Sequence, residues 1–570
     1  MVTTVEALED GRLRHPLRGW LLAGVLALLA FGLRIVNLGF PNKIVFDETY
    51  YAKEAWGLIH SGYERKWADN EQFHTNDRIA EGDLSGFLPD PQYVVHPPLG
   101  KWLIGLGEHW FGMNAFGWRF MACVFGALLV FFTVLLARRL SRSLLVGGIA
   151  GVLLTVDGLA FTMSRIALLD IFQAVFCLMA VLALVVDRDW FRVRLAAHLR
   201  ARDLPDLDGS FGPLMLFRPW RIAAGLLFGA ACAVKWNSLY LIAVFGIVTV
   251  AWDLGARSLA GAGKLRVLTW KAWVPAAVAL AGGVGLFGPK VGHVQAALLI
   301  GAVVGLLLYA WSVGMERSLL IDAPMAFIST VVLAVPVYLA SWAGWLVTSG
   351  GYYRNWGAQN PDHPLVKAIG APLASLWEYH SAAYNFHVGD SMMVNATHVY
   401  EAHPAGWLVM ARPIGIDAQN EIQPGEQGCE AVGTTCLRVI SGLGTPLLWW
   451  LACAALVAGL WWWLGRRDWR FAVPVLGVLA VWLPWFQYAG RPLFFFYAIV
   501  LLPFYVTGLA MAMGKLLGPA DGPHRQRNAM FIGVAIGLVI LNFAFIHPIL
   551  TDELLTRPQW LARMWFGTWI

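Results

Sequence analysis

The stretch that decides the fold is residues 20–48, WLLAGVLALLAFGLRIVNLGFPNKIVFDE. Its first part, residues 20–40, is apolar and long enough for a helix that crosses the ~30 Å hydrocarbon core of a bilayer. Two adjacent acids, Asp47 and Glu48, follow where such a helix would leave the membrane. Two carboxylates at a bilayer surface are tolerated when they are solvated or paired, and a long polar stretch opens directly after them. This order predicts chemistry at one membrane face.

Composition places the rest of the chain in the membrane as well. Of its 570 residues, 58% are hydrophobic and 14% charged, and its 29 tryptophans suit the membrane interfaces. We expect an all-α membrane fold with about 11 to 13 transmembrane helices, since apolar segments of suitable length recur. The candidate segments are 20–40, 118–137, 144–161, 166–186, 222–236, 239–252, 273–288, 294–313, 321–347, 444–464, 471–488, 493–513 and 529–547.

Lysine and arginine predict the orientation. They gather in the short loops that alternating crossings place on one side, which the positive-inside rule makes cytoplasmic together with the N-terminus. The long polar loops 41–117 and 348–441 then face outward, on the extracytoplasmic side of a multi-pass cell membrane protein. The net charge of +6 is a topology signal and indicates no nucleic-acid partner. The basic residues include Arg12, Arg14, Arg18, Arg138, Arg139, Arg142, Arg257, Lys264, Arg266, Lys271, Arg466, Arg467, Arg470, Lys515, Arg525 and Arg527.

These loops divide the chain into three parts. Residues 1–347 form an N-terminal transmembrane region that includes the first outer loop, residues 348–441 form the second outer loop, and residues 442–570 form a C-terminal transmembrane region. An odd number of crossings would leave the C-terminus outside.

Cysteine usage adds one alternative. Cys429 and Cys436 lie in the second outer loop, where an oxidising environment could join them in a disulfide or leave them free. The remaining four lie in apolar runs and are most simply small buried side chains. The spacing of cysteines and histidines gives no zinc motif.

Ionisable residues inside or at the ends of apolar segments are the next candidates for function. Such residues are rare at this depth and usually face a protein interior or an aqueous cavity. The alternative is that each snorkels to the interface or pairs structurally, and Arg165 and Asp170 could neutralise one another across one helix turn. The set comprises Arg34, Arg119, Arg165, Asp170, Lys235 and Arg491.

Several of these residues stand in motifs that resemble those of the protein O-mannosyltransferases. The motifs follow in family order over residues 15–550, and the short second outer loop resembles the actinobacterial branch. The motifs are Phe46-Asp47-Glu48, His96-Pro97-Pro98-Leu99-Gly100-Lys101, Arg165-x-x-Leu168-Leu169-Asp170, Ala233-Val234-Lys235-Trp236, and Tyr379-His380 followed by Tyr384-x-Phe386-His387.

The resemblance implies a GT-C glycosyltransferase that takes mannose from polyprenyl-phosphate-mannose. The implied acceptors are Ser or Thr hydroxyls of secreted or membrane polypeptides, with delivery during Sec translocation as one open route. Asp47 matches the family's base position, and Glu48 would orient the site or contact the acceptor. A hydroxyl is a weak nucleophile that a positioned carboxylate can activate. Direct displacement at the anomeric carbon would invert its configuration.

The leaving polyprenyl phosphate is negative, so fixed cations are expected around it. The resemblance and the membrane position favour Arg119, Lys235 and Arg491, with Arg165 behind them and Asp170 beside them. His96 could hydrogen-bond sugar or phosphate. The second outer loop offers acceptor-side candidates, and no cofactor is required, although a divalent cation near the acid pair stays open. The acceptor-side candidates are Tyr379, His380 and His387.

Two rival functions remain. Another GT-C enzyme could move a lipid-linked sugar to a glycan or lipid, because an acid after the first helix is common to such enzymes. A transporter would also carry charges within the membrane, but transporters show inverted repeats and broken helices near the midplane. The motifs around His96 and Lys235 favour the protein mannosyltransferase.

Overall fold

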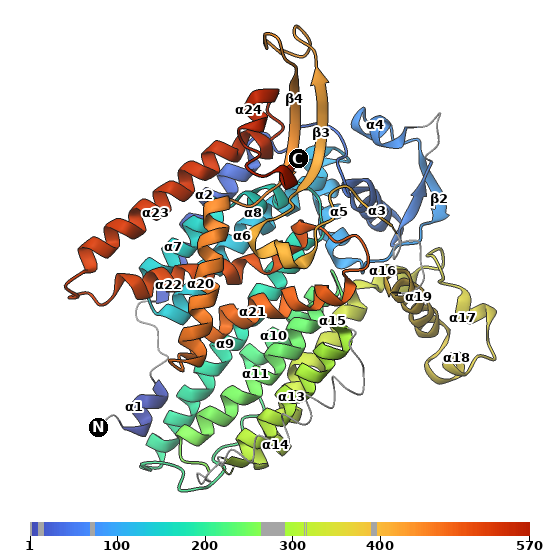
Figure 1. The fold of residues 1–570 in the computed structure, drawn as a ribbon. Coiled ribbons are helices and arrows are strands. Elements are labelled where there is room, and N and C mark those ends of the chain that lie inside the picture. The colour runs from blue at the N-terminus through green and yellow to red at the C-terminus, as the bar shows by residue number, and fades with distance from the viewer. Residues whose placement is uncertain are drawn as a thin grey trace.

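The structure is a computed structural model that describes residues 3–9, 16–68, 74–263, 291–312, 314, 316–388 and 396–570. Helices dominate it, as expected (Figure 1). Among these residues, 8 helical segments are long and apolar enough to cross a bilayer, and shorter apolar helices accompany them. The expected crossing at 273–288 and the basic residues Arg12, Arg14, Lys264, Arg266 and Lys271 lie outside the described residues.

The first half of the chain builds the centre of the bundle. Its helices are α1 (Thr4–Glu9), α2 (Pro16–Ile35), α6 (Ala115–Ser141), α7 (Leu144–Thr155), α8 (Gly158–Met163), α9 (Asp170–Ala201), α10 (Pro219–Cys232) and α11 (Ser238–Leu259). Helix α9 packs against α6, α10 and α11, and most of its apolar length is buried. A helix that is apolar on every side needs such neighbours. Little of α2 is buried, as suits a helix that faces lipid.

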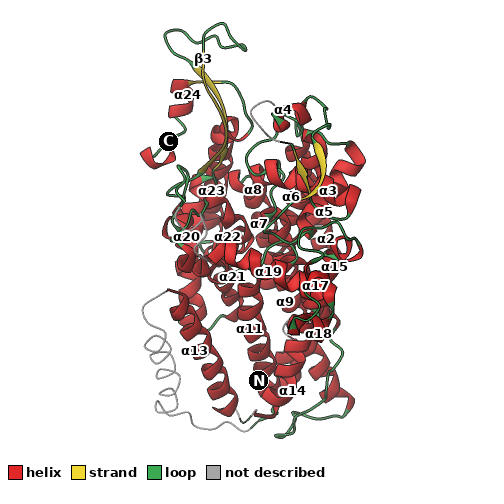
Figure 2. Cartoon of the chain, turned by 90° about the vertical axis from the view of Figure 1, so that its right-hand side faces the viewer, coloured by secondary structure: helices red, strands yellow, loops and turns green. Residues whose placement is uncertain are grey.

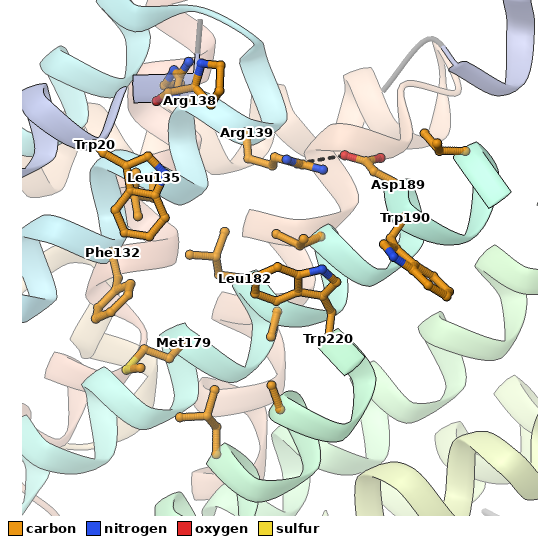
Figure 3. A pocket seen from close by; sticks show the side chains of 16 residues that line it. Trp20, Phe132, Leu135, Arg138, Arg139, Met179, Leu182, Asp189, Trp190 and Trp220 are labelled. Carbon is orange, nitrogen blue, oxygen red and sulfur yellow. Dashed lines mark hydrogen bonds and ion pairs between the residues drawn. The ribbon is translucent and has the colours of Figure 1, made fainter. Parts of the chain in front are cut away.

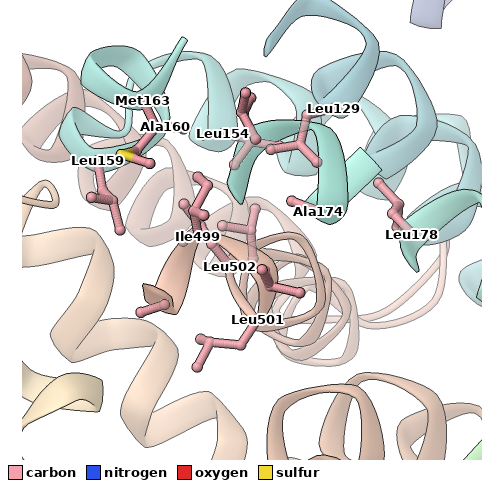
Figure 4. Packing of buried hydrophobic residues seen from close by; sticks show 14 of the residues in the cluster. Leu129, Leu154, Leu159, Ala160, Met163, Ala174, Leu178, Ile499, Leu501 and Leu502 are labelled. Carbon is pink, nitrogen blue, oxygen red and sulfur yellow. The ribbon is translucent and has the colours of Figure 1, made fainter. Parts of the chain in front are cut away.

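The second half closes the bundle against the first. Its helices are α13 (Val291–Ser312), α14 (Glu316–Phe327), a π-helical turn (Ile328–Val332), α15 (Ala334–Ser341), α16 (Ala343–Val347), α20 (Pro446–Leu464), α21 (Ala472–Trp482), α22 (Leu502–Leu517) and α23 (Arg525–Ile546). Figure 4 shows Ile499, Leu501 and Leu502 packed near Leu154 of α7 and Leu159 of α8. One hydrophobic core therefore runs through both halves. The three-part division of the chain stays a prediction.

The polar segments gather at one end of the bundle, which we call the loop end (Figures 1 and 2). The N-terminus lies at the opposite end, which we call the basic end. The first polar loop contains the helices α3 (Glu48–Ser61) and α5 (Leu99–Phe111), and the loops also contain strands, which were not anticipated. The other elements are β1 (Arg65–Trp67), α4 (Thr75–Ala80), β2 (Phe87–Pro91), α17 (Trp356–Gln359), α18 (Pro364–Ile369), α19 (Ala371–Val388), β3 (Ile414–Ile422), β4 (Cys436–Gly442), β5 (Leu555–Thr556) and α24 (Arg557–Leu561).

The strands form two small antiparallel sheets. Strand β1 pairs with β2, and a second sheet has the order β3–β4–β5. Cys429 and Cys436, which the sequence left open, form a disulfide with a Cα–Cα distance of 5.8 Å. This bond ties the turn of the β3–β4 hairpin to the start of β4.

A buried ionic network fastens the basic end. Arg218 and Arg221 both bind Asp187 of α9 and Asp253 of α11, with nitrogen–oxygen distances of 2.6–3.1 Å. All four side chains are almost fully buried. Two cations and two anions balance, so the network joins three helices without leaving a net buried charge.

Removing one anion from this network should destabilise the protein strongly. Asp253→Asn leaves two buried guanidinium groups with one carboxylate, and breaking a buried pair typically costs about 3–5 kcal/mol. Thermal unfolding of the purified protein in detergent measures the effect. Arg200→Gln, which breaks an exposed pair with Glu9, is the control and should leave the unfolding temperature almost unchanged. Equal unfolding temperatures for both variants would contradict the network's role.

Candidate active site

Asp47 precedes α3, and within the part of the chain that the structure describes its carboxylate makes no hydrogen bond. Its backbone carbonyl accepts hydrogen bonds from the N–H groups of Tyr50 and Tyr51 at 3.0 and 3.1 Å, but its side chain does not cap the helix. Burial raises the pKa of Asp47 to about 6; the Lys235 cation opposes this shift, and Asp170 and Glu54 add to it. A half-buried carboxylate of this kind is ionised at neutral pH and able to accept a proton.

Glu48, in contrast, is fully engaged. Its two oxygens accept from Nε and Nη2 of Arg119 at 2.8 and 2.9 Å. They also accept from the backbone N–H groups of Val45 and Ala167, both at 3.0 Å. The adjacent acids therefore have different environments: Glu48 anchors the loop, and Asp47 is available for chemistry.

Two of the three arginines predicted near the phosphate, Arg119 and Arg165, donate hydrogen bonds to the segment before Asp47. The remaining N–H groups of Arg119 donate to backbone carbonyls, so all five of its donors are used by the protein. Arg165 donates to carbonyls at the end of α2, and it does not pair with Asp170. The carbonyl acceptors are Leu38, Pro41 and Lys43 for Arg119, and Arg34, Val36 and Asn37 for Arg165.

Lys235 and Asp170 form an ion pair, and the charges of both residues act on the Asp47 carboxylate. Lys235 Nζ lies 2.8 Å from Asp170 Oδ2 and 5.2 Å from the ring centre of Tyr497. Asp170 begins α9, where a helix N-terminus favours a negative charge. Among the residues that the structure describes, Asp170 is the hydrogen-bond partner of Lys235, and the ammonium group has further N–H donors that a phosphate could take.

Three of the motifs in the sequence meet at Gly100. The N–H of Leu99 donates to the carbonyl of Ala233 at 3.0 Å, which joins the start of α5 to the turn before Lys235. A Cβ atom on Gly100 would lie 2.8 Å from Leu169 and 3.2 Å from Val234. The small size of glycine lets these segments pack closely, so the motifs around His96, Asp170 and Lys235 converge on one place.

His96, His387 and Arg491 are further polar side chains close to the pair of Lys235 and Asp170. The two imidazole rings are stacked with centres 5.3 Å apart. Burial lowers the pKa of His96 well below its usual value, with Lys235 adding to the effect, and burial lowers the pKa of His387 to about 4. Both rings are therefore neutral at pH 7. Among the described residues, Nδ1 of His387 and Nε of Arg491 have no hydrogen-bond partner, and Arg491 borders a cavity of about 300 Å³.

Tyr379 and His380 lie on α19, next to the segments that carry His96 and Lys235. The Tyr379 hydroxyl accepts from the N–H of Val94 at 3.0 Å. His380 donates from Nδ1 to the carbonyl of Leu376 and accepts at Nε2 from the Tyr338 hydroxyl. Tyr338 in turn accepts from Trp236 at 2.9 Å. Both residues thus tie α19 to the segments that carry His96 and Lys235.

Two further residues, Lys101 and Tyr497, contribute to the site and had no role predicted from the sequence. Lys101 is fully buried between Glu54 and Glu64, at 3.0 and 2.9 Å, and clamps α5 to α3. Its place in the motif after His96 was a signal that went unassigned. Tyr497 lies close to Lys235, and nothing in the surrounding apolar sequence marks it.

Comparison with known proteins identifies the family. The dolichyl-phosphate-mannose-protein mannosyltransferase family matches residues 92–196. A polyprenol-phosphate-mannose–protein mannosyltransferase of Mycobacterium tuberculosis is 33% identical over 564 residues, which cover 97% of this chain and 92% of the relative. The enzyme of the same name from Corynebacterium glutamicum is 30% identical over 96% of this chain and 93% of its own.

A solved structure shows the same fold. The Saccharomyces cerevisiae protein O-mannosyltransferase Pmt1–Pmt2 complex aligns with a TM-score of 0.64 at 13% identity, covering 100% of this chain and 95% of its counterpart. A similarity to an arabinosyl transferase of Pseudomonas savastanoi, at 32% identity, covers only 20% of this chain. The chain belongs to the polyprenol-phosphate-mannose–protein mannosyltransferase family of glycosyltransferases and has the GT-C membrane fold.

Proposed function

We propose that this enzyme transfers mannose from polyprenyl-phosphate-mannose to Ser or Thr hydroxyls of polypeptides, with inversion at the anomeric carbon. The observation that carries the proposal is the unbonded Asp47 carboxylate within the field of the Lys235–Asp170 pair. Relatives named for this reaction along nearly the whole chain support it. The limited match to an arabinosyl transferase gives the glycan or lipid acceptor less support.

In the proposed reaction, Asp47 accepts the proton of the acceptor hydroxyl. The hydroxyl oxygen forms a bond to the anomeric carbon while the bond from that carbon to the phosphate oxygen breaks. The polyprenyl phosphate leaves with the electron pair, and Lys235 and Arg491 stabilise its charge. A β-linked donor would give an α-linked product.

The other site residues have supporting roles in this proposal. Neutral His96 and His387 are placed to hydrogen-bond sugar hydroxyls, and Asp170 orients Lys235. Glu48, Arg119 and Arg165 hold the Asp47 segment through the contacts described above, so we do not assign them to phosphate. Tyr379 and His380 position α19 and influence acceptor binding only through the placement of this helix.

The proposal assigns no step to a metal ion. Within the described ranges, no group of three or more His, Cys, Asp or Glu side chains is arranged to hold one. The cations that the proposed reaction uses are side chains of the chain itself.

We also propose that the loop end faces away from the cytoplasm. The disulfide at this end suits an oxidising compartment, and arginines concentrate at the other end. Acceptors would then be secreted or membrane polypeptides that reach the site after or during Sec translocation.

Asp47→Asn should abolish most turnover. The amide keeps the size of the side chain but cannot take the hydroxyl proton, and loss of a general base typically costs about 10²–10⁴-fold. The assay follows radiolabelled mannose from polyprenyl-phosphate-mannose to a Thr-containing peptide, with donor binding measured in parallel and expected to persist. Asp90→Asn, in the same loop and exposed, is the matched control and should be fully active.

The pH profile separates a base from a structural acid. Because the pKa of Asp47 is raised to about 6, kcat/KM should be constant above this pH and decline as pH falls through it. An ordinary carboxyl group would give the same decline only near pH 4. Full activity of Asp47→Asn would refute the mechanism. Label that appears in glycolipid and not in peptide would refute the proposed class of acceptor.

A double-mutant cycle tests Lys235. If Lys235 binds the leaving phosphate, Lys235→Met should lower kcat/KM for the donor by roughly ten- to a hundredfold. The double variant Lys235→Met/Asp170→Asn should then be no more active than Lys235→Met. A purely structural pair predicts the reverse, since removing both partners relieves the unpaired buried charge.

The control for this cycle is Lys367→Met, which breaks an exposed ion pair with Asp362 at the loop end. It should leave donor kinetics unchanged. Recovery of near-normal donor kinetics in the double variant would remove Lys235 from the phosphate site.

Cysteine labelling tests the orientation. Ser85→Cys and Asn360→Cys place exposed thiols at the loop end, and Ala201→Cys places one at the basic end. The background lacks Cys123, Cys177, Cys232 and Cys453. An impermeant thiol reagent should label the first two in intact cells without an outer barrier, and Ala201→Cys only after lysis. The opposite pattern would invert the proposed topology.

A further inference from the structure

A second cavity lies far from Asp47, between α2, α6, α9 and α10 (Figure 3). Its volume of about 700 Å³ lies within the ~300–1,000 Å³ typical of ligand pockets. Apolar side chains make up most of its walls, among them Phe132, Leu135, Met179 and Leu182. Asp189 at its edge is about 28 Å along α9 from Asp170, at 1.5 Å per residue. The cavity therefore belongs to the basic end and not to the transfer site.

One end of this cavity is cationic. Figure 3 shows Arg138 and Arg139 there, and Arg139 Nε lies 2.8 Å from Asp189 Oδ2. The other oxygen of Asp189 accepts from Arg188 at 2.9 Å. Arg138 donates to the carbonyl of Pro16 at 3.2 Å. One carboxylate thus serves two guanidinium groups, so Asp189, Arg139 and Arg188 together carry a net positive charge.

Tryptophans place this charged end at the membrane surface. Trp20, Trp190 and Trp220 line the cavity, and the indoles of Trp20 and Trp220 are exposed on the outside of the bundle. Tryptophan is enriched at the boundary between headgroups and acyl chains. The arginines then lie at headgroup level, and the apolar walls reach into the acyl region.

We propose that this cavity binds one anionic phospholipid, with its phosphate at Arg138 and Arg139 and an acyl chain along Met179 and Leu182. Arginine binds phosphate oxygens through charge-assisted hydrogen bonds. In the proposed orientation the basic end faces the cytoplasmic leaflet, whose anionic lipids are attracted to basic residues. The lipid would fill the gap between α2 and the α9–α10 pair. This binding goes beyond the transfer reaction and does not depend on it.

Native mass spectrometry of the full-length protein, delipidated and then titrated with phosphatidylglycerol or phosphatidylcholine, tests the proposal. The wild type should retain one phosphatidylglycerol and prefer it to phosphatidylcholine by about tenfold or more. Leu182→Trp fills the cavity and should lose this lipid. Arg138→Gln/Arg139→Gln should bind the two lipids equally. Leu28→Trp, on an exposed face of α2, is the matched control and should behave as wild type.

A photoactivatable phosphatidylglycerol gives a second measurement that needs no variant. In the wild type its crosslinks should map to α9 and α10 around Leu182 and Trp220. Equal retention by Leu182→Trp and wild type, or crosslinks only elsewhere, would overturn the proposal. Displacement of phosphatidylglycerol by polyprenyl phosphate would also overturn it, because the cavity would then hold the tail of the donor.

Discussion

The bidentate ion pair between Glu48 and Arg119 is the contact on which the site depends. Taking two charges out of water costs several kcal/mol per ion unless their remaining hydrogen-bonding capacity is met. Here each Glu48 oxygen accepts twice, and every Arg119 N–H finds an oxygen. The pair therefore holds the segment from Leu38 to Glu48 in one conformation. The Asp47 side chain therefore needs no hydrogen bond to hold its position, and its carboxylate remains able to bind a substrate.

Helix α9 sets the distance between this site and the basic end. Asp170 and Asp187 are about 26 Å apart along the helix, close to the ~30 Å thickness of the hydrocarbon core, and no charged residue lies between them. Each acid pairs with a cation from one end of α10, Lys235 at one side and Arg221 at the other. Both charged pairs thus lie near a membrane surface, and the helix pair cannot shift along the bilayer normal without dragging charges into hydrocarbon.

Much of the fold could be predicted from the sequence, because an apolar segment of about 20 residues is itself the signal of a membrane crossing. The convergence of the segments around Asp47, His96, Asp170 and Lys235 was also expected from their motifs. The partners of individual charges were not. Glu48 looks equivalent to Asp47 in the sequence, and its fate is set by Arg119, which lies 71 residues away. Arg165 could have paired with Asp170, but it donates instead to backbone carbonyl groups at the end of α2. Short strands such as β1 carry too few residues for a period to show, and Tyr497 reaches the site only through tertiary packing.

The charges around Asp47 also imply an order of events. Asp47 and Asp170 carry negative charges, Lys235 and Arg491 carry positive charges, and the neighbouring imidazoles are neutral, so the side chains of the site are close to balanced in charge. The Lys235 cation lowers the pKa of Asp47 against the effect of burial. A donor phosphate at Lys235 would neutralise that cation and bring its own negative charge, and both effects raise the pKa of Asp47. The carboxylate would thus become the stronger base once the donor is bound, which favours activation of the acceptor hydroxyl only when a mannose is present to receive it.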